Sequence, residues 1–408
     1  MPYQDSINAS ASTGAQPTRH AGAAQALILV FTTQLPIMGL LSLIPIIPLL
    51  ARHFGEHPQA ALLIPLLITA PSACIALLSP LAGYLADKLG RRRLLLIAVF
   101  FYGVCGFAPF FLTDLVSIVA CRFLLGITEA VIMTVANTLF GDFFDPEPRR
   151  KWLAVQSAVG SLSGTILMLI GGLLGTMGWN GPFLLYLLAF PIFLGLLLWT
   201  WEPEHRSEAH ESSTRTRFPA ANMAIVAAVT LFCAVLYYVE VLQISQVLHA
   251  LGVESTATIG VAGGIAGLGV PLGALIFARL SRRGIQLHLM VVFTLFAIGL
   301  VGLGMATNIY LAVAAAFIAQ VGCGMLIPAL MNWCLGGLIF EHRGKGVGIW
   351  TASFFIGQFV SPFVVGKISN LLGGLLPAVV ALGVVALGAL IVTALMISVV
   401  RARTFQAC

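Results

Sequence analysis

The chain has 408 residues, of which 59% are hydrophobic and only 9% are charged. Roughly a quarter of the residues of a soluble globular domain carry charge, so this composition excludes an ordinary water-soluble protein. The formal net charge of +6 does not indicate a nucleic-acid partner, because the basic residues stand in the connectors between long apolar runs, where membrane topology places them.

The apolar runs predict about twelve membrane-spanning helices, since each run exceeds the roughly 18 residues that a bilayer-spanning helix needs. Residues 1–23 are small and polar and predict a disordered tail, not a cleaved signal peptide. The predicted helices of the first half are 24–50, 58–86, 94–112, 115–140, 152–176 and 182–200. After a charged linker at 201–218, those of the second half are 220–251, 256–280, 285–306, 310–338, 347–371 and 377–400, followed by a tail at 401–408. The chain therefore divides into units at 24–200 and 219–400.

Lysine and arginine gather in alternate connectors, at 88–93, 149–151, 206–217, 279–283, 343–345 and 401–403. The other connectors retain little more than Arg52, with Lys367 in a predicted helix nearby. Because this bias sets the orientation of membrane proteins, both termini are predicted to be cytoplasmic, in the inner or plasma membrane.

The connector between the second and third helices carries Gly83, then Asp87 four residues later, then Gly90 and a basic run that begins at Arg91. This spacing resembles the hallmark loop of the major facilitator superfamily. The resemblance implies the all-α major facilitator fold, with 12 transmembrane helices in two six-helix bundles. It also implies that Asp87, Arg91 and Asp142 form a charge network that latches the outward-open state. Gly83 would allow close helix approach, and Gly90 would supply a tight turn.

The fourth helix carries Arg122, Glu129 and Asn137 on one face, within an arc of about 80°. An ionisable side chain at this depth costs about 2.5 to 3.5 kcal/mol and usually has a function. We expect these residues to face an aqueous cavity, with Glu129 and Arg122 coupling proton movement to transport. The alternative is a structural role, in which neighbouring helices satisfy Arg122 and Glu129 separately.

The resemblance also implies that helices one, four, seven and ten line a central cavity. Glu240 in the seventh helix is then a second candidate for proton coupling, although it could also be an interfacial residue. The candidate solute contacts are polar or aromatic residues of these four helices, and packing in the core is the alternative for the tyrosines. They are Gln34, Asn137, Tyr237, Tyr238, Gln243, Gln320 and Asn332.

The direction of transport stays open between two hypotheses. Helix ten carries Gly322, Gly324 and Pro328, and helix eleven carries Gly357 and Pro362. These helices resemble those of the drug and small-metabolite exporter branch, which is the most similar branch of the superfamily. However, Thr165 follows Gly164 where drug exporters typically have proline. The fourth helix is also similar to that of organic-anion symporters. We favour proton-coupled export of a small amphipathic compound, with proton symport of an organic anion that pairs with Arg122 or Lys367 as the alternative. A non-transporting receptor of the same fold is a remote third hypothesis.

The sequence contains no GxxxxGK[ST] phosphate loop, no HExxH and no metal-spaced cluster, so we expect neither an enzyme nor a cofactor or metal site. The glycines of the fifth and eighth helices predict close helix packing. The predicted partners are a small-molecule substrate, protons and the lipid bilayer, and the protein is expected to act as a monomer without nucleic acid.

Overall fold

The computed structural model of the protein describes residues 21–203 and 218–406. Every regular element in these ranges is helical, and twelve segments are long and apolar enough to cross a membrane. This confirms the all-α fold and the number of spans that the hydropathy pattern predicts. Most of the predicted disordered tail and of the predicted linker, at 1–20 and 204–217, lies outside the described residues, as do 407–408.

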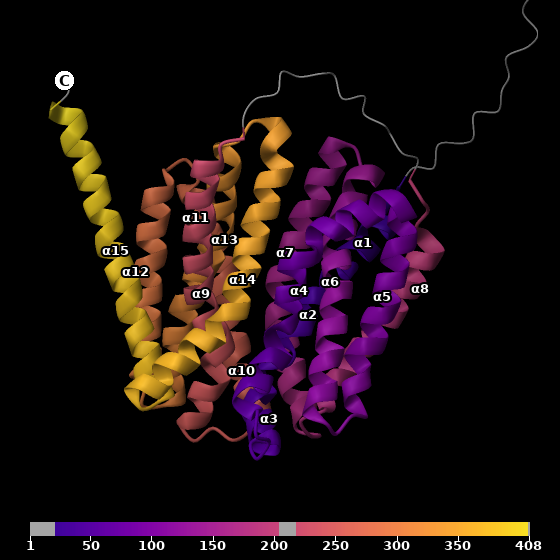
Figure 1. Ribbon diagram of the computed structural model, residues 1–408, viewed down its shortest axis with the longest axis horizontal. Helices are drawn as coiled ribbons and strands as arrows, with labels where there is room; N and C mark the ends of the chain where they lie inside the picture. The colour runs from indigo at the N-terminus through magenta and orange to yellow at the C-terminus, as the bar shows by residue number, and fades with distance from the viewer. Residues whose placement is uncertain (1–20, 204–217, 407–408) are drawn as a thin grey trace, which may run out of the picture.

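The first six spans form one bundle, which contains the elements α1 to α8 (Figure 1). Their bounds are α1 Ala23–Thr32, α2 Leu35–Leu41, η1 Ile44–Ile46, α3 Ile47–Phe54, α4 Ala60–Leu89, α5 Arg91–Phe107, η2 Ala108–Phe110, α6 Leu115–Phe143, α7 Pro146–Gly175, η3 Gly181–Leu188 and α8 Ala189–Trp199.

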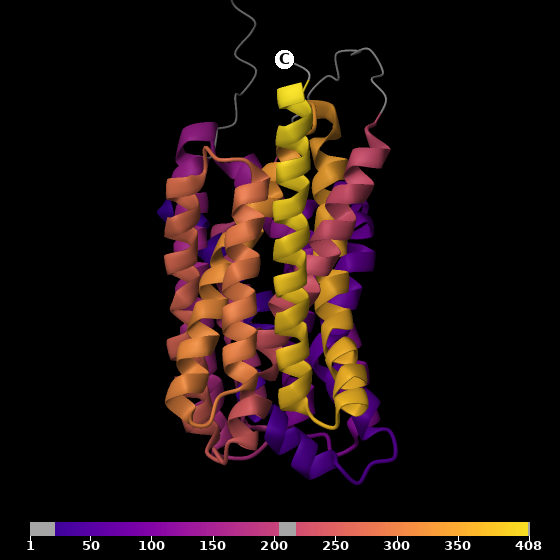
Figure 2. The same ribbon diagram turned by 90° about the vertical axis from the view of Figure 1, so that its left-hand side faces the viewer.

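The last six spans form the second bundle beside it (Figures 1 and 2). Their bounds are α9 Ala220–Ala250, α10 Thr256–Gly267, α11 Gly269–Leu280, α12 Ile285–Gly304, α13 Ile309–Gly336, α14 Phe340–Leu372 and α15 Leu375–Gln406.

Several helices extend beyond the ranges that hydropathy predicts. The fifth span begins at Pro146 instead of residue 152, α14 begins at Phe340 instead of 347, and α15 continues to Gln406 through the predicted tail. Hydropathy marks the part of a helix that matches the bilayer, whereas the backbone bonds of a helix continue into polar sequence.

The first span is broken into four pieces, whereas most of the others are continuous. Prolines occupy an early position of α2, η1 and α3, where the missing N–H costs little. The breaks leave some carbonyl oxygens near the centre of the bundle without a helical donor, and the site described below uses one of them.

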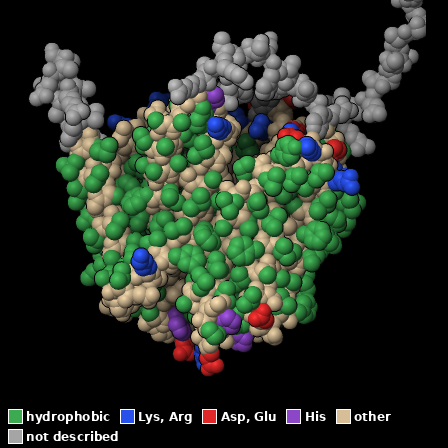
Figure 3. Space-filling view, in the orientation of Figure 1, with side chains coloured by type: hydrophobic (Ala, Val, Ile, Leu, Met, Phe, Trp, Pro, Cys, Tyr) green, Lys and Arg blue, Asp and Glu red, His purple; other side chains and the backbone are tan. Residues whose placement is uncertain are grey.

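The two ends of the molecule differ in charge. We call the end that carries Arg91, Arg149, Arg282 and Arg343 the basic end, and the other the opposite end; Figure 3 shows the blue Lys and Arg side chains gathered mainly at the basic end. The far end of α15 also lies at the basic end (Figure 1).

The bundles contact each other through glycines of α7 and α10. A Cβ atom at Gly172 would lie 2.8 Å from the Cα of Gly260, and one at Gly260 would lie 2.9 Å from the Cα of Gly172. The Thr165 hydroxyl also donates a hydrogen bond of 3.2 Å to the Gly264 carbonyl across the same interface. The predicted close packing of these glycines is confirmed.

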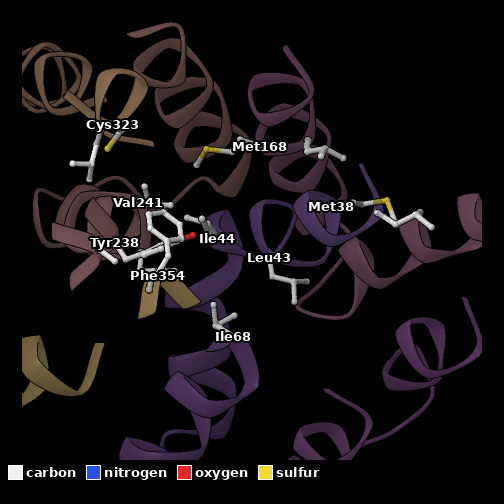
Figure 4. Packing of buried hydrophobic residues seen from close by; sticks show 14 of the residues in the cluster. Met38, Leu43, Ile44, Ile68, Met168, Tyr238, Val241, Cys323 and Phe354 are labelled. Atoms are coloured by element: carbon white, nitrogen blue, oxygen red, sulfur yellow. The ribbon is translucent and has the colours of Figure 1, made fainter. Parts of the chain in front are cut away.

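Further contacts join the bundles between α4 and α14, and between the broken first span and the second bundle. η1 and α3 pack against α9, and Ile44 lies beside Tyr238 and Val241 in the core (Figure 4). At the basic end the bundles diverge (Figure 1), and Figure 3 shows the surface hollowed between them there. The molecule is therefore closed toward the opposite end and open toward the basic end.

Candidate functional site

Arg122 lies in the interior of the first bundle, where its side chain is 1% exposed. Its Nε donates a hydrogen bond of 2.8 Å to the Leu67 carbonyl of α4, and one Nη donates a bond of 2.7 Å to the Gly39 carbonyl of α2. Its other Nη donates to the Tyr186 hydroxyl of η3. The guanidinium therefore ties together three spans besides its own.

Both carbonyl oxygens are free for a local reason. Leu67 precedes Pro71 by one helical turn, and proline has no N–H to close the helical bond. Gly39 lies where the first span breaks, and the amide of Leu43 there bonds to Leu40 instead. A buried carbonyl without a donor is costly, so the arginine satisfies two acceptors that helix irregularities create.

Glu129 is 2% exposed and lies against the same broken span. A Cβ atom at Gly39 would collide with its Oε1, and the Tyr102 hydroxyl would lie 3.4 Å from that Cβ. Among the described residues, Oε1 of Glu129 has no hydrogen-bond partner. Arg122 and Glu129 are close enough for their charges to interact, but they form no direct ion pair.

The expected orientation of this helix face is corrected in part. Arg122 and Glu129 point into the first bundle, and of the three predicted cavity residues only Asn137 is exposed. The helical spacing places residues on one face, but it does not say which neighbour covers each turn of that face. The free carbonyls of α2 and α4 draw Arg122 inward.

The second bundle holds a buried carboxyl group of its own. Glu240 of α9 is 1% exposed, and its Oε2 accepts a hydrogen bond of 2.7 Å from Gln320 Nε2 of α13. Its Oε1 has no partner among the described residues. Burial at this level means that Glu240 is not the interfacial residue that the sequence left open.

Tyr237 and Tyr238 lie beside Glu240 in α9 and pack against α14. Their ring centroids are 5.5 and 5.6 Å from that of Phe354, which they contact edge-on (Figure 4 labels Tyr238 and Phe354). This geometry is that of an aromatic core cluster. It gives the two tyrosines a packing role, whether or not a solute reaches them.

The remaining candidate contacts lie at different levels of the molecule. Gln34 is 9% exposed, with Oε1 lacking a partner among the described residues and directed toward Gly160 of α7. Asn137 is exposed and accepts a hydrogen bond of 3.3 Å from Gln156, a residue of α7 that sequence reasoning missed. Asn332 is exposed in α13 toward the basic end. Gln243 lies elsewhere, because it lines a cavity toward the opposite end.

A charge network lies at the basic end, as the hallmark loop implies. Arg91 forms ion pairs with Asp87, at 3.2 Å, and with Asp142. Gly90 has φ +91°, a conformation that side chains rarely adopt, so glycine is required at this turn. Gly83 packs against Thr134 of α6. All these residues belong to the first bundle, so the network alone does not join the two bundles.

Glu202 completes this network and was not predicted, because it stands in the charged segment that was assigned to a linker. Its carboxylate oxygens accept hydrogen bonds from the backbone N–H groups of Arg91, Arg92 and Arg93. An anion at a helix N-terminus satisfies free donors and interacts favourably with the helix dipole. The Arg92 side chain in turn donates to the Leu197 carbonyl at 2.9 Å. The end of α8 is thereby fixed to the start of α5.

Sequence reasoning also missed two tyrosines that lie near Arg122 and Glu129. Tyr102 donates its hydroxyl hydrogen bond to the Leu35 carbonyl, and Tyr186 accepts from Arg122. Both are fully buried. A polar tip on a buried aromatic residue needs a partner, which is the signal that could have pointed to them. Within the described residues, no group of three or more His, Cys, Asp or Glu could hold a metal ion.

Comparison with known proteins places the chain in a family. The model of the Major Facilitator Superfamily matches residues 26–338. The chain belongs to this superfamily. Its members are transporters, so the protein is a multi-pass membrane transporter, and nothing in the family or fold indicates catalysis.

The curated relatives of this superfamily member include resistance proteins. The chain is 25% identical to the class C tetracycline resistance protein of Escherichia coli over 84% of its length and 89% of the relative's. It is 26% identical to multidrug resistance protein 1 of Bacillus subtilis strain 168, over 73% and 79% of the two chains. The solved structure of a D-xylose–proton symporter has the same fold, with a TM-score of 0.71 at 14% identity, covering 90% of this chain and 96% of that one.

Proposed function

We propose that this transporter exports a small amphipathic compound, such as a drug or a metabolite, in exchange for protons. The observation that carries the proposal is the pair of buried carboxyl groups, Glu129 in one bundle and Glu240 in the other, each with an oxygen that lacks a partner among the described residues. An ionised carboxyl group without a partner is costly in an apolar interior, so each group favours its neutral form until water or a cation reaches it. The resistance relatives support export over uptake.

Alternating access supplies the coupling. Both carboxyl groups are buried while the basic end is open, so water would reach them, and a proton would leave or enter, as the bundles rearrange toward the other state. Arg122 supplies a fixed positive charge near Glu129, which offsets part of the cost of ionising it. A proton moving down its gradient releases about 1.4 kcal/mol per pH unit and about 2.3 kcal/mol per 100 mV. One or two protons per cycle would therefore drive substantial expulsion of the solute.

The protein would lie in the inner or plasma membrane. The bias of lysine and arginine toward one end supports an orientation in which the basic end faces the cytoplasm. Both termini would then be cytoplasmic, and the open end described above would face the cytoplasm. A solute would enter there between Asn137, Gln156 and Asn332, which are partly or fully exposed on three different helices. Gln34, Gln320 and the tyrosines would meet it deeper in the molecule.

The charge network would act as a latch in the other state. The Asp87 side chain is 64% exposed, and its partner Arg91 forms ion pairs with both Asp87 and Asp142. When the bundles close at the basic end, Asp87 would face the second bundle and stabilise the outward-open state. Gly83, Gly90 and Asp142 would keep the loop in position for that contact.

Proton symport of a small organic anion is the second candidate, and one observation bears on it. Arg122 is fully engaged with carbonyl and hydroxyl acceptors, so it is a poor partner for a substrate carboxylate. Lys367 is exposed and would have to bind the anion instead. A monomeric chain would suffice for either process.

Proteoliposomes with an imposed pH gradient separate the two directions. The probe is tetracycline, with a pH-sensitive dye in the lumen. Antiport predicts that the lumen becomes more acidic as tetracycline leaves it, whereas symport would move both species the same way. Ligand binding without any flux would instead indicate a receptor. If tetracycline is inert, a susceptibility panel of toxic amphiphiles in cells that lack their main efflux pumps replaces it, and protection against none of them would contradict export.

A further inference from the structure

A cavity of about 540 Å³ lies between the bundles toward the opposite end. One wall comes from α4, with Ile64 and Ile68, and the other comes from α9 and α14, with Leu242 and Phe363. These side chains make a mostly apolar surface that both bundles share. The cavity is separate from the hollow at the basic end, through which the solute would enter.

Lys367 of α14 brings a positive charge to this apolar cavity. Gln243, Gln246 and Asn370 add amide groups that can donate hydrogen bonds, and no carboxylate is found among the described residues that line the cavity. Lys367 is exposed and forms no ion pair with any described residue. The lining therefore offers a cation and amide donors to an anionic group, and an apolar surface to a hydrocarbon chain.

The position of Lys367 agrees with a lipid-like ligand. It lies in the last two turns of α14, which ends at Leu372. A lysine near the end of a membrane-spanning helix places its ammonium group at the level of the lipid headgroups. The apolar wall of Ile64, Ile68 and Phe363 would accompany an acyl chain that runs from that level toward the centre of the membrane.

We propose that this cavity binds an amphiphile with an anionic headgroup, supplied by the lipids of the surrounding membrane. The phosphate group would contact Lys367 and Asn370, and one acyl chain would lie between α4 and α14. Because the lipid would contact both bundles, it would favour the state in which this cavity exists over the state in which the bundles part at the opposite end. The proposal does not depend on the direction of solute transport.

The test measures lipid binding to the full-length protein by native mass spectrometry. The purified protein is titrated with phosphatidylglycerol or, separately, with zwitterionic phosphatidylcholine. We expect tighter binding of phosphatidylglycerol, and we expect Lys367→Gln to weaken it about fivefold, as for a partly exposed ion pair. Lys367→Arg keeps the charge and should retain binding. Arg52→Gln is the matched control, because Arg52 is an exposed cation of α3 outside the cavity.

Three results would overturn the proposal. The first is equal binding of the two lipids by the wild type. The second is a failure of the variants to differ. Lys367→Gln would bind phosphatidylglycerol as the wild type does, or Arg52→Gln would lose as much affinity for phosphatidylglycerol as Lys367→Gln. The third concerns the source of the ligand: if dodecyl phosphate added to phosphatidylcholine nanodiscs binds through Lys367 while phosphatidylglycerol does not, the site takes a free amphiphile and not a membrane lipid.

Discussion

Arg122 donates a hydrogen bond of 2.8 Å to the carbonyl oxygen of Leu67, the acceptor that Pro71 leaves without a helical donor. The proline of α4 and the arginine of α6 are therefore complementary in hydrogen bonding. The proline leaves a carbonyl acceptor of α4 without a donor, and the guanidinium, which has five donors and stays charged, supplies that donor. This arrangement explains why an arginine is tolerated in the interior of the first bundle.

Replacing Arg122 by lysine should destabilise the protein although the charge is kept. A single ammonium group cannot reach the Leu67 and Gly39 carbonyls and the Tyr186 hydroxyl in the same geometry. We expect a loss of about 2 kcal/mol in the free energy of unfolding, measured by thermal unfolding in detergent micelles. The exposed Arg150→Lys should stay within about 0.5 kcal/mol of the wild type. An unchanged midpoint for Arg122→Lys would refute the bonding scheme.

Replacing Pro71 by alanine should weaken the hold of α4 on Arg122. Alanine restores an N–H that competes for the Leu67 carbonyl. A double-mutant cycle with Arg122→Lys should therefore give a coupling energy of about 1 kcal/mol. Pro80→Ala in the same helix is the control, because Pro80 is exposed and should not couple to Arg122. Equal coupling for both prolines would mean a general effect on the helix.

Replacing Glu202 by alanine should loosen the start of α5. The loss of a helix cap typically costs about 1 kcal/mol, and here the backbone N–H groups of Arg91 to Arg93 lose their acceptor. Hydrogen exchange of these amides should accelerate about fivefold. The exposed Glu254→Ala leaves this helix untouched and should not change their exchange. Exchange at the wild-type rate in Glu202→Ala would show that the contact contributes nothing.

Enlarging Gly172 should shift the conformational equilibrium. A leucine there cannot fit against Gly260, so the bundles should separate at the opposite end. Spin labels at positions 56 and 254, which are exposed on different bundles near that end, should report longer distances in a background without the native cysteines. Gly388→Leu is the control, since a Cβ at Gly388 meets no atom within 4 Å beyond its chain neighbours and its own helical backbone. Identical distance distributions for both variants would contradict a closing role for the glycine contact.

The sequence predicts the fold well because its signals are local. Long apolar runs predict the twelve spans, and the spacing from Gly83 to Arg91 indicates the family. The resemblance to that family in turn implies the contact of Arg91 with Asp87 and Asp142. Glycine in α7 and α10 likewise predicts close packing, which the contact between Gly172 and Gly260 confirms.

The candidate site is less predictable because it depends on contacts between distant segments. Helical spacing groups Arg122 with Glu129, but the direction of that face is decided by free carbonyls on α2 and α4. Pro71 is a visible sign of one such carbonyl, whereas the break at Gly39 and the hydroxyl of Tyr186 are not readable from composition. In the sequence Glu202 belongs to a charged linker, and its contact with the start of α5 depends on the packing of α8 against α5.

The central claim is that Glu129 and Glu240 carry the protons that drive transport. It is tested by reconstituting Glu129→Gln and Glu240→Gln in proteoliposomes, and by recording proton flux and tetracycline flux together under an imposed pH gradient. Each variant should exchange solute down its concentration gradient while losing proton flux and uphill transport, whereas the exposed Glu147→Gln should behave as the wild type does. If both carboxyl variants move protons and drive uphill transport at wild-type rates, these two residues are not the proton carriers.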